Sequence, residues 1–358
     1  MTDPGNVPAL SAGSGSRVLL PVPGLGVPHA WQVGPVRFLP AGAARELIEA
    51  MPRDGKRIDD PVFREWLDGR VSVLSGSAVA EVAGAGAQAD ALETVSGALE
   101  ILRAVQHMHN PMVSMSHQTF GLPGDVPSAV VDYVSMGDAL TVGAARRGAL
   151  AGWTFNDAAH EAWTTDPALR FLDDAFTRAE PDRTTLHSRA LLAVSLLSQG
   201  WLSCKPDVEL LNSAMALEVL LGEASDQDKK FRIARRASYF SCGWPRQLYP
   251  GTGRPACPLL SLPLDSSRPG APGRELKTLL HDMRAGRAHP CTYFLDVCDV
   301  YDARNEIVHR GQLPASWPRP DTWFIAAHLL GQVLAWFARH PGAELSLLDS
   351  EISSLPPP

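Results

Sequence analysis

Three side chains near the end of one predicted helix, residues 292–309, have the chemistry of an acid–base site for an anionic substrate. They are Arg304, Asn305 and His309. Histidine takes up and releases a proton near neutral pH, and arginine carries a permanent charge that neutralises anionic oxygens. Asparagine both donates and accepts hydrogen bonds, so it can orient the other two. Together they predict proton transfer beside a neutralised anion.

The predicted helix carries these polar groups on or beside its apolar face. Apolar residues recur there at 3.6-residue spacing, Asn305 falls on their line, and Arg304 borders it. His309 follows Asn305 by four residues and shares its face. Burial of an unpaired polar group costs roughly 1 to 3 kcal/mol, so a purely structural helix would have apolar residues here. The apolar line consists of Phe294, Val297, Cys298, Tyr301 and Val308.

A second polar interruption occurs in the helix predicted over residues 207–221. Glu218 lies there on the apolar side, with Ala214, Met215 and Leu221 as its spaced neighbours. The pattern therefore predicts a half-buried carboxylate. Such a group can orient Arg304 or His309 through a charge-assisted hydrogen bond, as carboxylates beside catalytic bases do.

The segment 301–311, with the sequence YDARNEIVHRG, resembles the R-N-x-x-x-H signature of the HEPN superfamily. The resemblance is greatest to Apea-like HEPN proteins. Residues 216–221 and the basic helix that contains Arg235 and Arg236 resemble the preceding helices of that subgroup, in the same order. The resemblance extends over residues 185–340, so the first 180 residues inherit no role from it.

The resemblance implies an all-helical bundle that forms a homodimer, in which two R-N-x-x-x-H helices face one cleft and cut RNA without a metal or cofactor. Arg304 and His309 are about 140° apart around the helix axis, which agrees with a cleft shared by two copies. His309 would exchange a proton with the ribose 2′-hydroxyl or the leaving oxygen, Arg304 would neutralise the phosphorane, and Asn305 would orient both. The products would carry 2′,3′-cyclic phosphates. Arg235, Arg236 and Arg310 are the candidate RNA contacts.

Two readings of this motif remain open. The first is an endoribonuclease with a toxin or anti-phage defence role, in which the N-terminal half senses a trigger or binds a regulatory partner. The second is a non-catalytic HEPN module that binds RNA or nucleotide, or scaffolds a partner, through the same polar cleft. A third role, as an acceptor of AMP, would require a tyrosine two residues after the histidine, where this chain has Gly311.

Local patterns predict an α+β protein with a mixed α/β domain followed by an all-α HEPN-type bundle. The expected parts are a flexible tail at 1–16, the α/β domain at 17–180, the helical domain at 181–345 with a Pro/Gly-rich insertion at 243–290, and a second tail at 346–358. Strands are expected at 17–22, 31–39, 77–82, 130–136 and 140–143. Helices are expected at 41–51, 61–67, 87–109, 186–202, 207–221, 226–241, 274–285, 292–309 and 321–340.

Charge is unevenly distributed along the 358 residues. The net charge is −7 in total, −8 over residues 1–180 and +3 over residues 181–345. This small excess favours an anionic ligand in the second half but not a broad duplex-binding face. No leader or membrane segment is evident, because the longest apolar stretch, 324–337, is interrupted by His328 and Gln332. We expect a cytoplasmic protein.

Cysteine usage does not indicate a disulfide framework, because the chain has five cysteines and no secretory signal. Three of them flank the insertion together with a histidine. A zinc site there is an alternative, although no C-x-x-C pair is present, and we expect reduced thiols and no metal. The four residues are Cys242, Cys257, His289 and Cys291.

Overall fold

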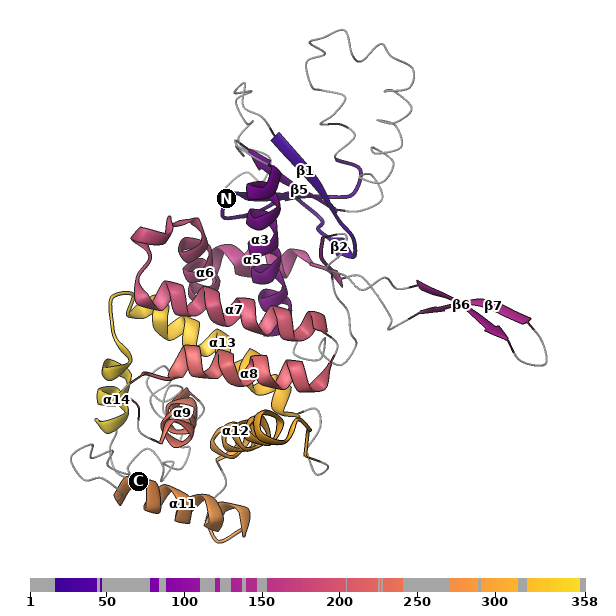
Figure 1. The fold of residues 1–358 in the computed structure, drawn as a ribbon. Helices are drawn as coiled ribbons and strands as arrows, with labels where there is room; N and C mark the ends of the chain where they lie inside the picture. The colour runs from indigo at the N-terminus through magenta and orange to yellow at the C-terminus, as the bar shows by residue number, and fades with distance from the viewer. Residues whose placement is uncertain are drawn as a thin grey trace, which may run out of the picture.

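The computed structural model of the chain describes most of the predicted elements (Figure 1). The helices expected at 41–51 and 61–67 and the tail at 1–16 lie wholly or largely outside the described residues. An antiparallel sheet near the N-terminus precedes a predominantly helical region, which confirms the α+β class. The described residues are 17–43, 46, 78–83, 88–109, 120–122, 130–136, 140–146, 153–203, 205–224, 226, 228–240, 271–288, 291–314 and 321–354.

The main sheet has four antiparallel strands in the order β1-β5-β4-β3. β5, made mostly of alanine and valine, lies in its interior and is almost fully buried, whereas β3 at the edge alternates between buried and exposed residues. Trp31 of β3 pairs with Phe38 of β4, and both side chains enter the core. The strand bounds are β1 (Arg17–Val22), β3 (Trp31–Val33), β4 (Val36–Leu39) and β5 (Ala78–Ala83).

The single strand predicted over 31–39 is wrong, because a turn divides it into β3 and β4. Gly34 adopts a φ of 53° in this turn, which disfavours any residue with a Cβ. A Cβ at Gly34 would also lie 2.4 Å from a ring carbon of Phe176, so the helix packed against the turn requires glycine too. The sequence signal for the turn was the Gly34-Pro35 pair.

The described residues also form two smaller strand pairs. β2 (Leu25–Gly26) pairs in parallel with β8 (Trp153–Thr154), which brings residues 25–26 next to residue 153. β6 (Val130–Met136) and β7 (Leu140–Arg146) form an antiparallel hairpin that extends away from the helices in Figure 1. Both strands of this hairpin were predicted, although the second is longer than expected.

Helix α3 (Gln88–His109) lies between the sheet and the helical bundle. Its buried face contains Val95, Leu99 and Leu102 and contacts strands on one side and α6, α7 and α13 on the other. Two helices that the sequence did not predict, α5 (Asp157–Thr165) and α6 (Pro167–Thr177), follow β8. Side chains of Asn156 and Asp166 accept hydrogen bonds from the first free amides of these helices, which is the usual N-capping signal.

The bundle itself contains α7 (Thr185–Ser203), α8 (Pro206–Leu221), α9 (Lys229–Ser238), α12 (Thr292–Arg310) and α13 (Asp321–Arg339). Helices α7 and α8 pack along each other as a hairpin, and α13 crosses behind both (Figure 1). Their predicted bounds are confirmed to within a residue at most ends, but α9 is shorter than the predicted 226–241. Among the described residues, no helix combines the length and apolarity that a bilayer crossing requires.

The tail predicted at 346–358 is wrong over most of its length, because Leu345–Ser353 forms helix α14. Leu345, Leu348 and Ile352 repeat at helical spacing and are buried. The insertion contains the expected short helix, α11 (Ala271–Arg284). The predicted domain boundary near residue 180 falls at a short 3-10 turn, Glu180–Asp182, and one continuous apolar core extends across it.

Helix α8 buries a carboxyl group, Glu209, near its N-terminal end. The side chain is only 7% exposed, and this burial raises its pKa to about 8. The folded protein therefore holds Glu209 protonated at a pH where an unfolded chain would ionise it. Stability from this difference is fully present below pH 4.5, the ordinary pKa of the group, and is lost as the pH rises to about 8.

We expect Glu209→Gln to remove this pH dependence. At pH 9 the variant should be more stable than the wild type by about 5 kcal/mol, whereas the two should be similar near pH 4. Urea unfolding across this range measures the difference. Asp207→Asn, an exposed neighbour in the same turn, is the matched control. Parallel pH profiles for the wild type and Glu209→Gln would contradict a neutral buried Glu209.

Candidate functional site

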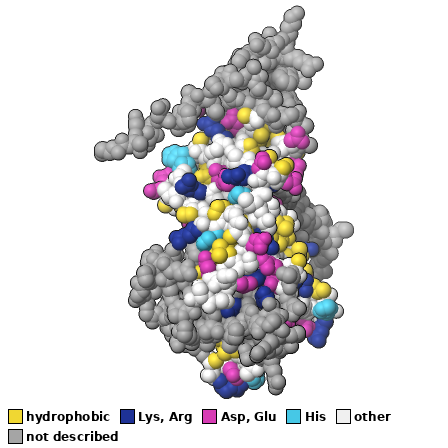
Figure 2. All heavy atoms as spheres, turned by 90° about the vertical axis from the view of Figure 1, so that its left-hand side faces the viewer, with side chains coloured by type: hydrophobic (Ala, Val, Ile, Leu, Met, Phe, Trp, Pro, Cys, Tyr) yellow, Lys and Arg dark blue, Asp and Glu magenta, His cyan; other side chains and the backbone are white. Residues whose placement is uncertain are grey.

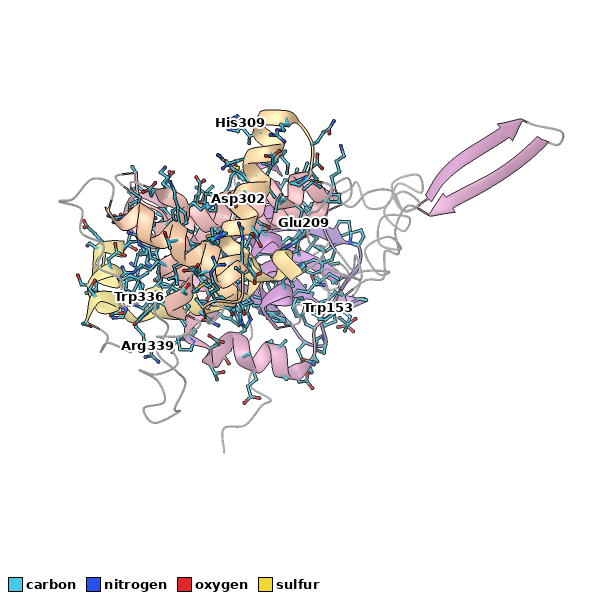
Figure 3. The ribbon with its side chains drawn as sticks, turned by 90° about the horizontal axis from the view of Figure 1, so that it is seen from below. Trp153, Glu209, Asp302, His309, Trp336 and Arg339 are labelled. Atoms are coloured by element: carbon cyan, nitrogen blue, oxygen red, sulfur yellow. The ribbon has the colours of Figure 1, made fainter. Side chains whose placement is uncertain are left out.

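Helix α12 presents the R-N-x-x-x-H residues at its C-terminal end. The helix ends where Gly311 adopts a left-handed conformation with φ of 70°, and the Gly311 amide donates to the Ile307 carbonyl at 2.8 Å. In Figure 3 the end that carries His309 projects beyond the other helices. The motif is therefore held at the tip of a helix whose other end packs in the core.

Arg304, Asn305 and His309 lie together on this tip. The Arg304 Nη1 donates a hydrogen bond to the Asn305 Oδ1 at 3.1 Å. Arg304 is half-buried, whereas Asn305 and His309 are exposed. Solvent therefore reaches all three functional groups, and the asparagine fixes the guanidinium of its neighbour.

The prediction that Asn305 interrupts a buried face is wrong. The buried stripe of α12 passes through Val300, Ala303 and Ile307, while Val308 on the predicted line is 55% exposed. The prediction extended the apolar line from Tyr301 to Val308. It therefore placed the buried face of α12 about one residue, or about 100°, away from its position in the structure. Asn305 thus needs no buried partner, and its exposure leaves its amide available to a ligand.

Glu218 is half-buried, as its position in α8 predicted, and it faces α12 through Tyr301. The Tyr301 hydroxyl is buried and has no hydrogen bond of ordinary geometry among the described residues. Burial, and then the nearby Glu218 carboxylate, raise the pKa of Tyr301, while Arg304 acts in the opposite direction. Glu218, Tyr301 and Arg304 are therefore close enough to interact, whereas the described contacts do not link Glu218 to His309.

Ion pairs attach another side of α12 to its neighbours. Lys230 Nζ of α9 lies 2.5 Å from Asp302 Oδ1, and Arg284 of α11 pairs with Asp299 and Asp302. Asp302 lies midway along the projecting helix in Figure 3. These contacts position α12 against α9 and against the helix of the insertion.

The structure contradicts Arg235 and Arg236 as RNA contacts, because both are buried within α9. Arg236 forms a bidentate pair with Asp349 of α14, through Nε at 2.9 Å and Nη2 at 2.6 Å. It also donates to Asp226 Oδ2 at 2.7 Å and to the Leu221 carbonyl at 2.6 Å. The signal that could have indicated burial is the run of small and apolar residues, 233–238, around the two arginines.

Arg310, the third candidate RNA contact, lies on the surface. Its Nη1 pairs with Glu306 Oε2 one turn earlier at 2.8 Å, and its side chain is 75% exposed. A pair this exposed holds the guanidinium weakly, so an anionic ligand can compete for it. Arg310 remains beside His309 as a candidate contact.

The zinc alternative falls mostly outside the described residues, which include only Cys291 of its four proposed ligands. Cys291 is buried, and its Sγ lies 3.3 Å from the Ser238 hydroxyl oxygen. Within the described part of the chain, no group of three or more metal-ligating side chains occurs. Cys298 on α12 is also buried, and burial raises its pKa to about 12, so this thiol is unreactive.

Comparisons of the chain with protein-family models, with curated proteins and with solved structures find no match. The HEPN resemblance therefore rests on the residues of α8, α9 and α12 alone. The arrangement of these residues, rather than a relative, must support any functional proposal.

Proposed function

We propose that this chain is a metal-independent endoribonuclease of HEPN type. The observation that carries the proposal is the grouping of Arg304, Asn305 and His309 at one projecting, solvent-accessible helix tip, with Arg304 hydrogen-bonded to Asn305. An arginine next to a histidine supplies charge neutralisation and proton transfer, the two requirements for phosphodiester transesterification.

In the proposed reaction, one His309 removes the proton of the ribose 2′-hydroxyl, and the 2′-oxygen attacks the adjacent phosphorus. The bond to the 5′-oxygen breaks, and that oxygen takes a proton from the His309 of a second copy. Arg304 neutralises the negative charge that develops on the phosphorane, and Asn305 holds the guanidinium in place. The products are a 2′,3′-cyclic phosphate and a 5′-hydroxyl.

A homodimer supplies both halves of this site. Arg304 and His309 diverge by about 140° around α12, so one narrow face of one helix does not present both. Val308, between them in the motif, is a large apolar side chain with high exposure, and Met215 of α8 is 45% exposed. A second α12 packed across this tip would cover Val308 and bring the opposing polar groups together.

The test incubates the purified chain with total cellular RNA in the presence of EDTA. We expect fragments with 2′,3′-cyclic phosphate ends, and a molecular mass in solution of twice the chain mass. Cleavage that requires an added divalent metal would contradict the proposed mechanism. A strictly monomeric active protein would contradict the shared cleft.

One observation favours the alternative, a non-catalytic HEPN module that binds RNA or nucleotide or scaffolds a partner. The His309 side chain makes no hydrogen bond to any other described residue, whereas catalytic bases are usually oriented by one. RNA binding without cleavage, in the wild type and in the presence of every candidate partner tested, would favour this alternative.

The endoribonuclease proposal includes a toxin or anti-phage defence role, which follows from the family resemblance.

Glu218 is expected to act as a positioning residue for Arg304 through Tyr301. Glu218→Gln keeps the size of the side chain but removes the charge, and we expect it to lower RNA cleavage by about tenfold. Because Glu218 is expected to orient Arg304 toward the bound transition state, kcat should fall more than KM rises. Glu306→Gln, which removes a carboxylate from the surface of α12, should have little effect. An equal loss in both variants would rule out a specific role for Glu218.

A further inference from the structure

Helix α14 covers a group of hydrogen-bond donors with its two inward carboxylates. Asp349 accepts both hydrogen bonds of the Arg236 fork and lies 3.8 Å from Arg232. Glu351 Oε2 accepts from the Tyr239 hydroxyl at 2.9 Å and from the Trp336 Nε1 at 2.9 Å. Its other oxygen lies 3.4 Å from His340 Nε2. The donors come from α9, from α13 and from the residue that follows each of these helices.

Positive and negative charges in this region balance only while α14 is in place. Four guanidinium groups and four carboxylates lie around α14 and the loop after α8, and two of the carboxylates belong to α14 itself. Without α14, two carboxylates would remain for four guanidinium groups. The guanidinium groups are those of Arg189, Arg232, Arg235 and Arg236, and the carboxylates are those of Glu223, Asp226, Asp349 and Glu351. Figure 2, seen from the α14 side, shows acidic and basic side chains next to each other in this region.

The geometry of these contacts also suits a phosphate group. A guanidinium fork binds carboxylate and phosphate oxygens with the same two parallel hydrogen bonds, and phosphate carries more charge. Tyrosine hydroxyls are common phosphate ligands beside arginine, and the tryptophan indole is a further hydrogen-bond donor. Asp349 and Glu351 therefore occupy positions that phosphate oxygens could take.

Helix α14 has the properties of a cover that can be displaced. It has nine residues, follows the last bundle helix and contributes three buried apolar side chains. Helices this short are not stable without tertiary contacts, and elements held by few buried apolar contacts open most readily. Much of its attachment consists of the ion pairs and hydrogen bonds that a competing anion would replace.

We propose that α14 is a displaceable acidic cover over a second, phosphate-binding site formed by Arg232, Arg236, Tyr239 and Trp336. This site lies on the opposite side of α9 from α12 in Figure 1, so it is separate from the R-N-x-x-x-H tip. Lys230 on α9 pairs with Asp302 on α12, which provides a contact between the two regions. The proposal does not depend on RNA cleavage at α12.

The first test follows hydrogen exchange of residues 345–353 in the full chain at constant ionic strength. We expect exchange in α14 to rise about tenfold when chloride is replaced by inorganic phosphate or when a decauridylate is added. A response to inorganic phosphate would show that one phosphate group is sufficient to displace α14. A response to the oligonucleotide alone would show that several neighbouring phosphates are required. Unchanged exchange with both ligands, or an equal rise with chloride alone, would overturn the proposal.

The second test removes the cover charges with Asp349→Ala/Glu351→Ala and measures affinity for the same ligands. We expect about tenfold tighter binding, because the ligand no longer competes with the carboxylates. Adding Arg232→Ala to this double variant should reverse the gain. The Arg232 side chain is mostly, but not fully, buried. Asp182→Ala/Glu161→Ala changes the net charge equally at exposed positions outside α14 and should bind as the wild type does. Equal gains in both double variants would indicate general electrostatics and contradict a specific site. Should the Asp349→Ala/Glu351→Ala variant fail to fold, the hydrogen-exchange measurement on the wild type tests the proposal instead.

Discussion

Arg304→Ala and His309→Ala are each expected to lower RNA cleavage by about 10²- to 10⁴-fold, the range for loss of a charge-stabilising group or a proton-transfer group. His309 is exposed and Arg304 is half-buried at the helix tip, so thermal stability should change little for His309→Ala and modestly for Arg304→Ala. Fragment formation from a labelled single-stranded RNA in EDTA measures the effect. Retained cleavage in both variants would exclude the proposed site.

Arg310→Ala is the matched control, because it removes a guanidinium from the same tip. Its pair with Glu306 is exposed, so we expect a modest loss of RNA affinity with kcat retained. A mixed dimer of one wild-type copy and one His309→Ala copy tests whether the cleft is shared. It holds only one of the two histidines that the proposed reaction uses, so it should be nearly as inactive as the His309→Ala dimer. Half of the wild-type activity in verified mixed dimers would contradict a shared cleft.

The helical bundle was largely predictable because its signals are local. The apolar spacing of α7, α8, α12 and α13 and the glycine after α12 depend only on neighbouring residues, and they set the helix bounds closely. The same local reasoning missed α5, α6 and α14, which are short helices of 9, 11 and 9 residues. It also joined β3 to β4 by ignoring the turn at Gly34.

The chemistry around the site was less predictable because it depends on contacts distant in sequence. The exposure of Asn305 depends on how α12 is oriented about its own axis against α8 and α9. An error of one residue in the predicted buried face was enough to reverse the predicted burial of Asn305. The roles of Arg235 and Arg236 could not be read from a basic run, because Asp349 lies more than a hundred residues away. Helix phase and long-range ion pairs are determined by packing, which a pattern on one helix does not reveal.

Arg236→Ala is expected to destabilise the fold by about 3 to 5 kcal/mol, the range for loss of one member of a buried ion pair. The Arg236 side chain is 1% exposed, and so is that of its partner Asp226, which would keep only the more distant Arg232, at 3.4 Å, as a counter-charge. The substitution also leaves the Leu221 carbonyl without this donor and releases Asp349 on α14. Burial disfavours the charged guanidinium, but its hydrogen bonds to Asp349 and Asp226 outweigh burial and raise its pKa.

Urea unfolding of the wild type and of two comparison variants tests this account. Arg232→Ala removes a guanidinium that is 21% exposed and more distant from the same carboxylates, so its cost should be about 1 kcal/mol or less. Arg236→Met/Asp226→Leu removes both buried charges and should be less destabilising than Arg236→Ala alone. If the double variant were the least stable of the three, the attraction between Arg236 and its partners would exceed the cost of burying them. The network would then be a net source of stability, and displacement of α14 would carry a correspondingly larger free-energy cost.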